Sequence, residues 1–126
     1  MKYLLLVHHN EEAFAKMSEA ARGEMLAESI KLCHELNGKG QYVSASPLHP
    51  SSMATVLRVR DGKRTVTDGP FIETREQIAG YFLIDAKDLD EAIAIAGRVP
   101  GARIGTVEIR PVREVAGLPA LDNREA

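Results

Sequence analysis

Residues 66–81 read VTDGPFIETREQIAGY, and this stretch separates two halves of the chain that each have the pattern strand, helix, strand. Pro70 keeps Gly69 out of the helical region, and the Asp68 carboxylate can accept hydrogen bonds from nearby backbone amides. Four charged residues lie between positions 68 and 76, directly before a strand expected at residues 78–85. Binding residues concentrate on loops that a rigid scaffold holds. The stretch is therefore either a rigid connection or a binding loop.

A β-hairpin is expected immediately before this loop. Residues 54–60 and 63–67 are strand-like runs joined through Asp61-Gly62, and this dipeptide favours the positive φ angles that a type I′ turn needs. The other strands are expected at residues 2–9, 41–46, 78–85 and 104–112.

One helix is expected in each half of the chain. Ser18 is expected to be the N-cap of the first helix, and residues 37–40 (NGKG) are a strong stop signal. Asp88 is expected to cap the second helix, with Glu91 three residues later as in a capping box. Residues 74–77 predict one short helical turn in the loop. The apolar stripe expected to face the core from the first helix is Leu26, Ile30, Cys33 and Leu36.

The order of these elements predicts an α+β, ferredoxin-like (split βαβ) fold with an inserted β-hairpin. Two helices can cover only one face of the sheet, and Thr106, Glu108 and Arg110 alternate onto the open face. Residues 2–9 are mostly apolar on both faces, so this strand needs cover on both sides. We expect a second copy of the chain to supply that cover, in a homodimer that closes sheet against sheet.

Composition excludes several classes of protein. The 126 residues suit one domain, and a formal net charge of −2 provides no electrostatic footprint for nucleic acid or an anionic membrane. Cys33 is the only cysteine, which excludes an internal disulfide, and we interpret it as a small core residue. The apolar run at residues 3–7 is too short for a signal peptide, and no stretch is long enough to span a bilayer. A cytoplasmic location is expected.

The loop and the strand after it carry a long set of specific residues. They are Thr67, Asp68, Gly69, Pro70, Phe71, Glu73, Thr74, Arg75, Glu76, Gln77, Gly80 and Tyr81. This set resembles the signature of the DGPF-domain proteins, a branch of the YCII-related superfamily, and the resemblance covers residues 1–113. It implies a ferredoxin-like fold that dimerises into an α+β barrel, small-molecule enzymology, and a link to extracytoplasmic-function sigma factors. Residues 114–126, where the pattern fades, are expected to form a poorly ordered tail.

One feature of the sister branch is absent from this sequence. In that branch a histidine in the body of the first helix is proposed to act with an aspartate as a catalytic pair. Here residues 24–30 read EMLAESI, and His34, the only histidine of this helix, comes late. The pair therefore cannot be transferred to this chain.

The candidate catalytic residues are Asp68, His49 and His8. An acid–base catalyst needs a pKa near the working pH, which favours histidine. His8 and His9 end the first strand on opposite faces, and His49 is held between two prolines. Each has a structural alternative, as a solvated strand-end or loop-packing histidine. For Asp68 the alternative is that its carboxylate organises the turn at residues 69–71.

The candidate ligand-binding residues are Arg58, Glu73 and Tyr81. A fixed guanidinium can grip a carboxylate or phosphate at two points, although Arg58 can equally form an ion pair with a loop carboxylate. We expect Arg58 and Asp68 to line one pocket together with His49 or His8.

Two functions remain open, and the sequence does not decide whether the protein is an enzyme. The first is cofactor-independent acid–base chemistry on a small polar or anionic molecule. The second is a non-catalytic module that binds a ligand or a regulatory partner, in line with the link to sigma factors. No phosphate loop, nucleophile elbow or dinucleotide fingerprint occurs, and the histidines lack metal-ligand spacing. No cofactor and no metal are expected.

Overall fold

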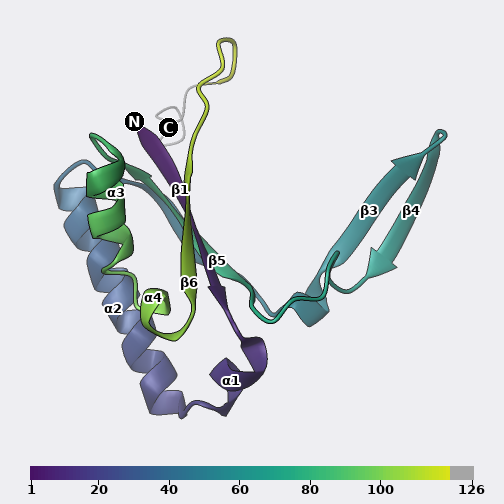
Figure 1. Cartoon of the computed structure of the whole chain (residues 1–126), viewed down its shortest axis with the longest axis horizontal. Coiled ribbons are helices and arrows are strands. Elements are labelled where there is room, and N and C mark those ends of the chain that lie inside the picture. The colour runs from purple at the N-terminus through teal and green to yellow at the C-terminus, as the bar shows by residue number, and fades with distance from the viewer. Residues whose placement is uncertain (120–126) are drawn as a thin grey trace.

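Four antiparallel strands form the main sheet of the computed structural model, which describes residues 1–119. Their order is β2-β5-β1-β6, with β1 and β5 in the middle. A separate two-stranded hairpin, β3–β4, projects from the body on the side opposite the long helices (Figure 1). The strands are β1 (Lys2–His9), β2 (Tyr42–Pro47), β3 (Thr55–Arg60), β4 (Lys63–Asp68), β5 (Gln77–Asp85) and β6 (Thr106–Pro111).

Helices α2 and α3 cover one face of the main sheet, as Figure 1 shows. The helical elements are α1 (Glu11–Lys16), α2 (Glu19–Gly38), η1 (Ser51–Met53), α3 (Leu89–Ala96) and α4 (Gly101–Ile104). The core lies between these helices and the sheet. Its largest fully buried apolar side chains include Leu5 of β1, Leu36 of α2 and Ile84 of β5. Burying side chains of this size supplies most of the stability of such a domain.

The α+β class predicted from the sequence is confirmed, and so are its local signals. Ser18 accepts a hydrogen bond from the amide of Ala21, and Asp88 caps α3 in the same way. Asp61 and Gly62 have φ angles of 52° and 75°, as the predicted hairpin turn requires. The sequence did not predict α1 and α4, which are only six and four residues long. The predicted helical turn at residues 74–77 is wrong, because that segment is a bend leading into β5.

The predicted apolar stripe of α2 is partly wrong. Leu36 is buried, but Leu26 and Ile30 are 52% and 50% exposed, and Leu32 is buried instead. The less exposed positions of the helix run from Met25 through residues 29 and 32 to Leu36, beside the predicted stripe. Leu26 and Ile30 also face the sheet, but the N-terminal half of the helix does not close against it, which leaves these two side chains exposed.

The open face of the sheet has the predicted composition. Thr106, Glu108 and Arg110 lie opposite His8, Leu6 and Leu4 of β1. The neighbouring residues Val107 and Ile109 pack against the core from the other face.

Residues 120–126, most of the tail predicted for 114–126, lie outside the described residues. Among residues 1–119, no helix has the length and apolar character needed to cross a bilayer.

Candidate functional site

A pocket of about 520 Å³ lies between α2 and the helix-covered face of the sheet. That volume is in the range of small-molecule sites. Strands β1, β5 and β2 line it on one side and α2 lines it on the other, and residues of α1 and of the start of α4 complete the lining. The lining is mostly apolar and includes Val7, Phe14, Met25, Leu26, Ile30, Cys33, Tyr42, Ala45, Pro47, Phe82, Val99 and Pro100.

Two histidines line this pocket, the exposed His34 of α2 and the half-buried His9 at the end of β1. The His9 ring stacks on Phe14, with centroids 4.4 Å apart and an interplanar angle of 23°. Burial lowers the pKa of His9, although the carboxylates of Glu11 and Glu76 act in the opposite direction. The imidazole is therefore neutral at physiological pH and can accept a proton from a ligand.

The irregularity beside this histidine lies in β5. Val7 of β1 lies opposite Gly80 but His8 lies opposite Ile78, so Ala79 is an extra residue in β5. The pairing of β1 with β6 continues without a shift through His8. Alternation along β1 therefore keeps His9 on the same face as Val7, which is the face that lines the pocket.

Arg22 is the cationic group that α2 contributes to the pocket lining. Its guanidinium donates hydrogen bonds to the carbonyl oxygens of Ala15 (3.2 Å) and Met17, and it lies 6.0 Å from the Phe14 ring centroid. These contacts hold a permanent positive charge near the neutral imidazole. A mostly apolar pocket with these two groups is suited to a flat, weakly acidic ring.

Cys33 of α2 lines the pocket and is half-buried. Burial raises the pKa of its thiol, so the thiol stays protonated at neutral pH. This is consistent with a packing role and does not favour a nucleophile.

The corner between β1 and α1 ties His9 to the charged loop and to the base of the hairpin. Asn10 donates to the carbonyl of Arg75 (2.9 Å), and the backbone N–H of Glu11 donates to the Gln77 side chain (3.0 Å). The Glu11 carboxylate in turn accepts from the N–H (2.7 Å) and hydroxyl of Ser51 in η1. The loop is therefore a structural brace for the end of the pocket that holds His9.

The structure does not bring Arg58 and Asp68 together as the sequence predicted. In the hairpin register, Arg58 lies opposite Thr65 while Asp68 lies opposite Thr55. Because side chains alternate along a strand, Arg58 and Asp68 point to opposite faces of the hairpin. Arg58 instead lies over the Phe71 ring, 5.2 Å from its centroid. The pocket predicted from these two residues is wrong for a single chain.

The predicted turn contacts of Asp68 are also wrong. Among the described residues, no side-chain hydrogen bond joins its carboxylate to the amides of residues 69–71, and the Gly69 amide donates to the Ala54 carbonyl instead (2.8 Å). His49 and Glu73 are exposed in the two loops that flank the hairpin.

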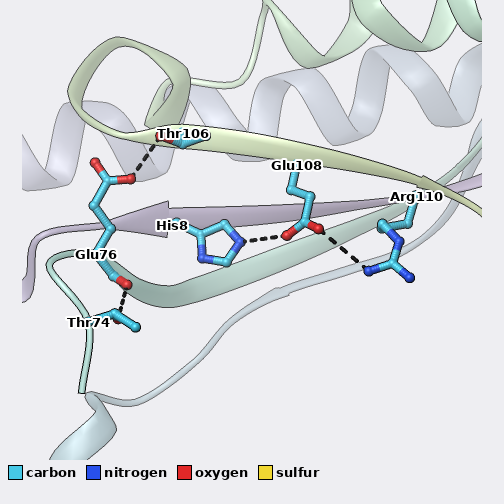
Figure 2. A network of polar contacts seen from close by, with 6 residues as sticks. All are labelled: His8, Thr74, Glu76, Thr106, Glu108 and Arg110. Atoms are coloured by element: carbon cyan, nitrogen blue, oxygen red, sulfur yellow. Dashed lines mark hydrogen bonds and ion pairs between the residues drawn. The ribbon is translucent and has the colours of Figure 1, made fainter. Parts of the chain in front are cut away.

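His8 lies on the open face of the sheet and does not line the pocket, whereas Tyr81, one of the predicted ligand-binding residues, is among the lining residues. Figure 2 shows the His8 ring directed at Glu108, with 3.1 Å between Nε2 and Oε1, and Arg110 beyond it. Glu76 accepts a hydrogen bond from the Thr106 hydroxyl in the same view (2.8 Å). The Tyr81 hydroxyl is 3.0 Å from the Ser44 hydroxyl. Within residues 1–119, no three His, Cys, Asp or Glu side chains gather closely enough to hold a metal ion.

Replacing His9 by glutamine is expected to reduce the loss of stability on acidification. The folded pKa of His9 lies below its ordinary value of 6.5, so the unfolded chain binds the proton more readily. The stability from the neutral ring is present above pH 6.5 and is lost as the pH falls through 6.5 toward the lowered pKa. Between about pH 8 and about pH 5, the melting temperature should fall less for His9→Gln than for the unmodified protein. An equal fall would contradict the neutral, half-buried imidazole.

Comparison with known proteins shows what the chain is similar to. The family model of the YCII-related domain matches residues 1–116. An uncharacterised protein of Rhizobium meliloti (strain 1021) is 31% identical over 114 residues, which span 89% of this chain and 92% of that protein. A solved structure with a similar fold is the 5-chloro-2-hydroxyhydroquinone dehydrochlorinase of Burkholderia phenoliruptrix AC1100, in complex with 2,5-dihydroxybenzoquinone. Its TM-score is 0.55 at 13% identity, over 91% of this chain and 96% of that one.

Proposed function

This chain belongs to the YCII-related domain family, and from that premise we propose that it binds a small, flat, weakly acidic molecule in the pocket under α2. We propose further that His9 accepts a proton from that molecule, in acid–base chemistry without a cofactor. The observation that carries the proposal is a neutral imidazole facing a pocket of about 520 Å³ whose other walls are mostly apolar.

The groups around the pocket have complementary roles in this scheme. The apolar walls and Phe14 hold the ring of the ligand, and the Arg22 guanidinium stabilises negative charge on its substituents. When His9 takes up a proton, the nearby carboxylates of Glu11 and Glu76 stabilise the imidazolium that forms.

The solved structural neighbour supports the class of ligand. Its complex contains 2,5-dihydroxybenzoquinone, a flat ring with acidic hydroxyl groups, and such a molecule matches the shape and polarity of the pocket described above. A non-catalytic binding module remains the alternative function. It would bind the same class of molecule without accelerating proton transfer.

The finer features of the fold are part of the same proposal. The strand order β2-β5-β1-β6 supports the ferredoxin-like plan, and the TDGPF run at residues 67–71 supports membership of the DGPF branch. We propose that residues 1–113 form the domain and that two copies pair through the open sheet face as a dimeric α+β barrel. A cytoplasmic location and a link to a sigma factor remain predictions from the sequence.

Binding is tested by calorimetry with 2,5-dihydroxybenzoquinone and with 2,4-dihydroxybenzoate, which is inert toward thiols. We expect saturable binding of at least one of them. Because Cys33 lines the pocket, bound 2,4-dihydroxybenzoate should also protect the Cys33 thiol from an added alkylating reagent. Replacing Arg22 by glutamine should weaken binding by about 10-fold to 100-fold, the usual value of a hydrogen bond to a charged group.

Arg113→Gln is the matched control, because Arg113 is an exposed cation beyond the end of β6. Equal affinity of the Arg22 and Arg113 variants, or alkylation of Cys33 at an unchanged rate, would reject the pocket as the binding site.

A further inference from the structure

The β3–β4 hairpin has one apolar and one cationic face. The hairpin register places Leu57 opposite Val66 and Val59 opposite Arg64, so the three apolar side chains share one face with Arg64, which lies near the turn. The other face carries Arg58, Arg60 and Lys63. This alternation is typical of an antiparallel sheet with one buried face.

Nothing in the described part of the chain buries that apolar face. Leu57, Val59 and Val66 are 57%, 56% and 57% exposed. The hairpin strands pair only with each other, and Figure 1 shows them pointing away from the body. Phe71 packs over Arg58 and so lies at the cationic face. An isolated two-stranded hairpin is marginally stable in water, so this hairpin needs cover from elsewhere.

The main sheet has an uncovered apolar surface as well. Leu4 and Leu6 of β1 point to the open face, where Ile78 of β5 is 45% exposed. The open face and the hairpin lie on the same side of the molecule, opposite α2 and α3 (Figure 1). Because the hairpin projects away, its apolar face does not reach the sheet of its own chain.

The distribution of charge favours a second copy of the chain as the partner that covers the apolar face of the hairpin. Residues 55–68 contain four cationic and two acidic side chains, a net charge of +2. The whole chain has a net charge of −2, so the remaining residues carry −4. Two hairpins therefore repel each other, whereas a hairpin and the body of another copy attract.

We infer that the apolar face of the hairpin (Leu57, Val59 and Val66) packs on the open sheet face of a second copy, reciprocally about a two-fold axis. Strands of six residues span about 20 Å, a length that suits a sheet and not a small-molecule pocket. The inference rests on the proposed homodimer and deepens it, because it assigns the hairpin as the arm that each copy extends over its partner.

The test is the oligomeric mass of two matched double variants, measured by light scattering and sedimentation across a dilution series. The unmodified protein should have about twice the chain mass of 13.8 kDa. Leu57→Asp/Val66→Asp places charge on the apolar face and should raise the dimer Kd by at least about 100-fold. Thr65→Asp/Thr67→Asp adds the same charge to the opposite face of β4 and should leave the Kd within about threefold.

Each remaining outcome overturns the inference. If the unmodified protein is a monomer, the hairpin does not pack on a second copy of the chain. If both double variants change the dimer Kd equally, the apolar face of the hairpin is not the contact surface. Circular dichroism checks that the variants fold, which is expected because the hairpin contributes no residue to the core. Leu6→Asp separates the two proposals. If it dissociates the dimer while Leu57→Asp/Val66→Asp does not, the sheet-face dimer stands and the arm contact is wrong.

Discussion

Replacing Gly105 by alanine is expected to destabilise the protein by about 1–3 kcal/mol or more and to disturb both histidines at the end of β1. A Cβ at this position would lie 2.0 Å from the carbonyl oxygen of His8 and 3.0 Å from the Cα of His9. Both neighbours are backbone atoms, which cannot move without separating β6 from β1. The φ angle of Gly105 is −156°, so the cost is steric overlap and not an unfavourable backbone conformation.

Gly23→Ala is the matched control for this substitution. Gly23 is exposed inside α2, and a Cβ there would have no heavy atom within 4 Å. Alanine should therefore stabilise the helix by about 0.5–1 kcal/mol. Urea unfolding of the two variants measures both values. If Gly105→Ala were as stable as the unmodified protein, the close contact between β6 and the end of β1 would be wrong.

The second large effect is expected on proton transfer. In D2O the protein should accelerate exchange of the ring hydrogens of 2,5-dihydroxybenzoquinone. A deuteron from the solvent adds to the ring carbon next to an ionised hydroxyl group, and the neutral His9 imidazole then removes the original hydrogen from that carbon as a proton. His9→Gln keeps a side chain of hydrogen-bonding type but cannot accept the proton, and it should slow the protein-dependent exchange by about 10²-fold to 10⁴-fold. Proton NMR follows the exchange directly.

His8→Gln distinguishes the two faces of the sheet in the same assay. His8 lies on the open face beside Glu108, whereas His9 lines the pocket. If exchange is lost in His8→Gln and retained in His9→Gln, the base is His8 on the open face and the assignment to His9 is wrong. Binding without any acceleration in the unmodified protein would favour the non-catalytic module.

The sequence left two roles open for the charged loop, a rigid connection or a binding loop, and its contacts in the structure favour the first. Residues 67–77 identified the resemblance, and the family is confirmed for residues 1–116. In the structure, however, Asn10 and Glu11 bind the end of this loop and brace the corner of β1 and α1. The loop supports the histidine from outside the pocket, and the sequence carries no signal for that contact because the paired residues are more than sixty positions apart.

Local chemistry determined what the sequence could predict by itself. The caps at Ser18 and Asp88, the turn at Asp61-Gly62 and the alternation of β6 each depend on residues within one or two turns of chain. Alternation also placed His9 on the same face as Tyr3, Leu5 and Val7, which is the helix-covered face. These signals were sufficient for the α+β class and for the composition of the open sheet face.

Tertiary packing decided where the pocket lies. Leu26 is exposed and Leu32 is buried, although they are less than two turns apart, because α2 closes against the sheet only in its C-terminal half. The same packing left its N-terminal half away from the sheet, so that His9 and Arg22 line one pocket. In the hairpin, Asp68 pairs with Thr55, and Thr55 lies three positions before Arg58 on the same strand. Arg58 and Asp68 are therefore on opposite faces.

The sequence does not reveal where the pocket lies, because its place depends on contacts between a helix and strands whose relative orientation only the folded core determines.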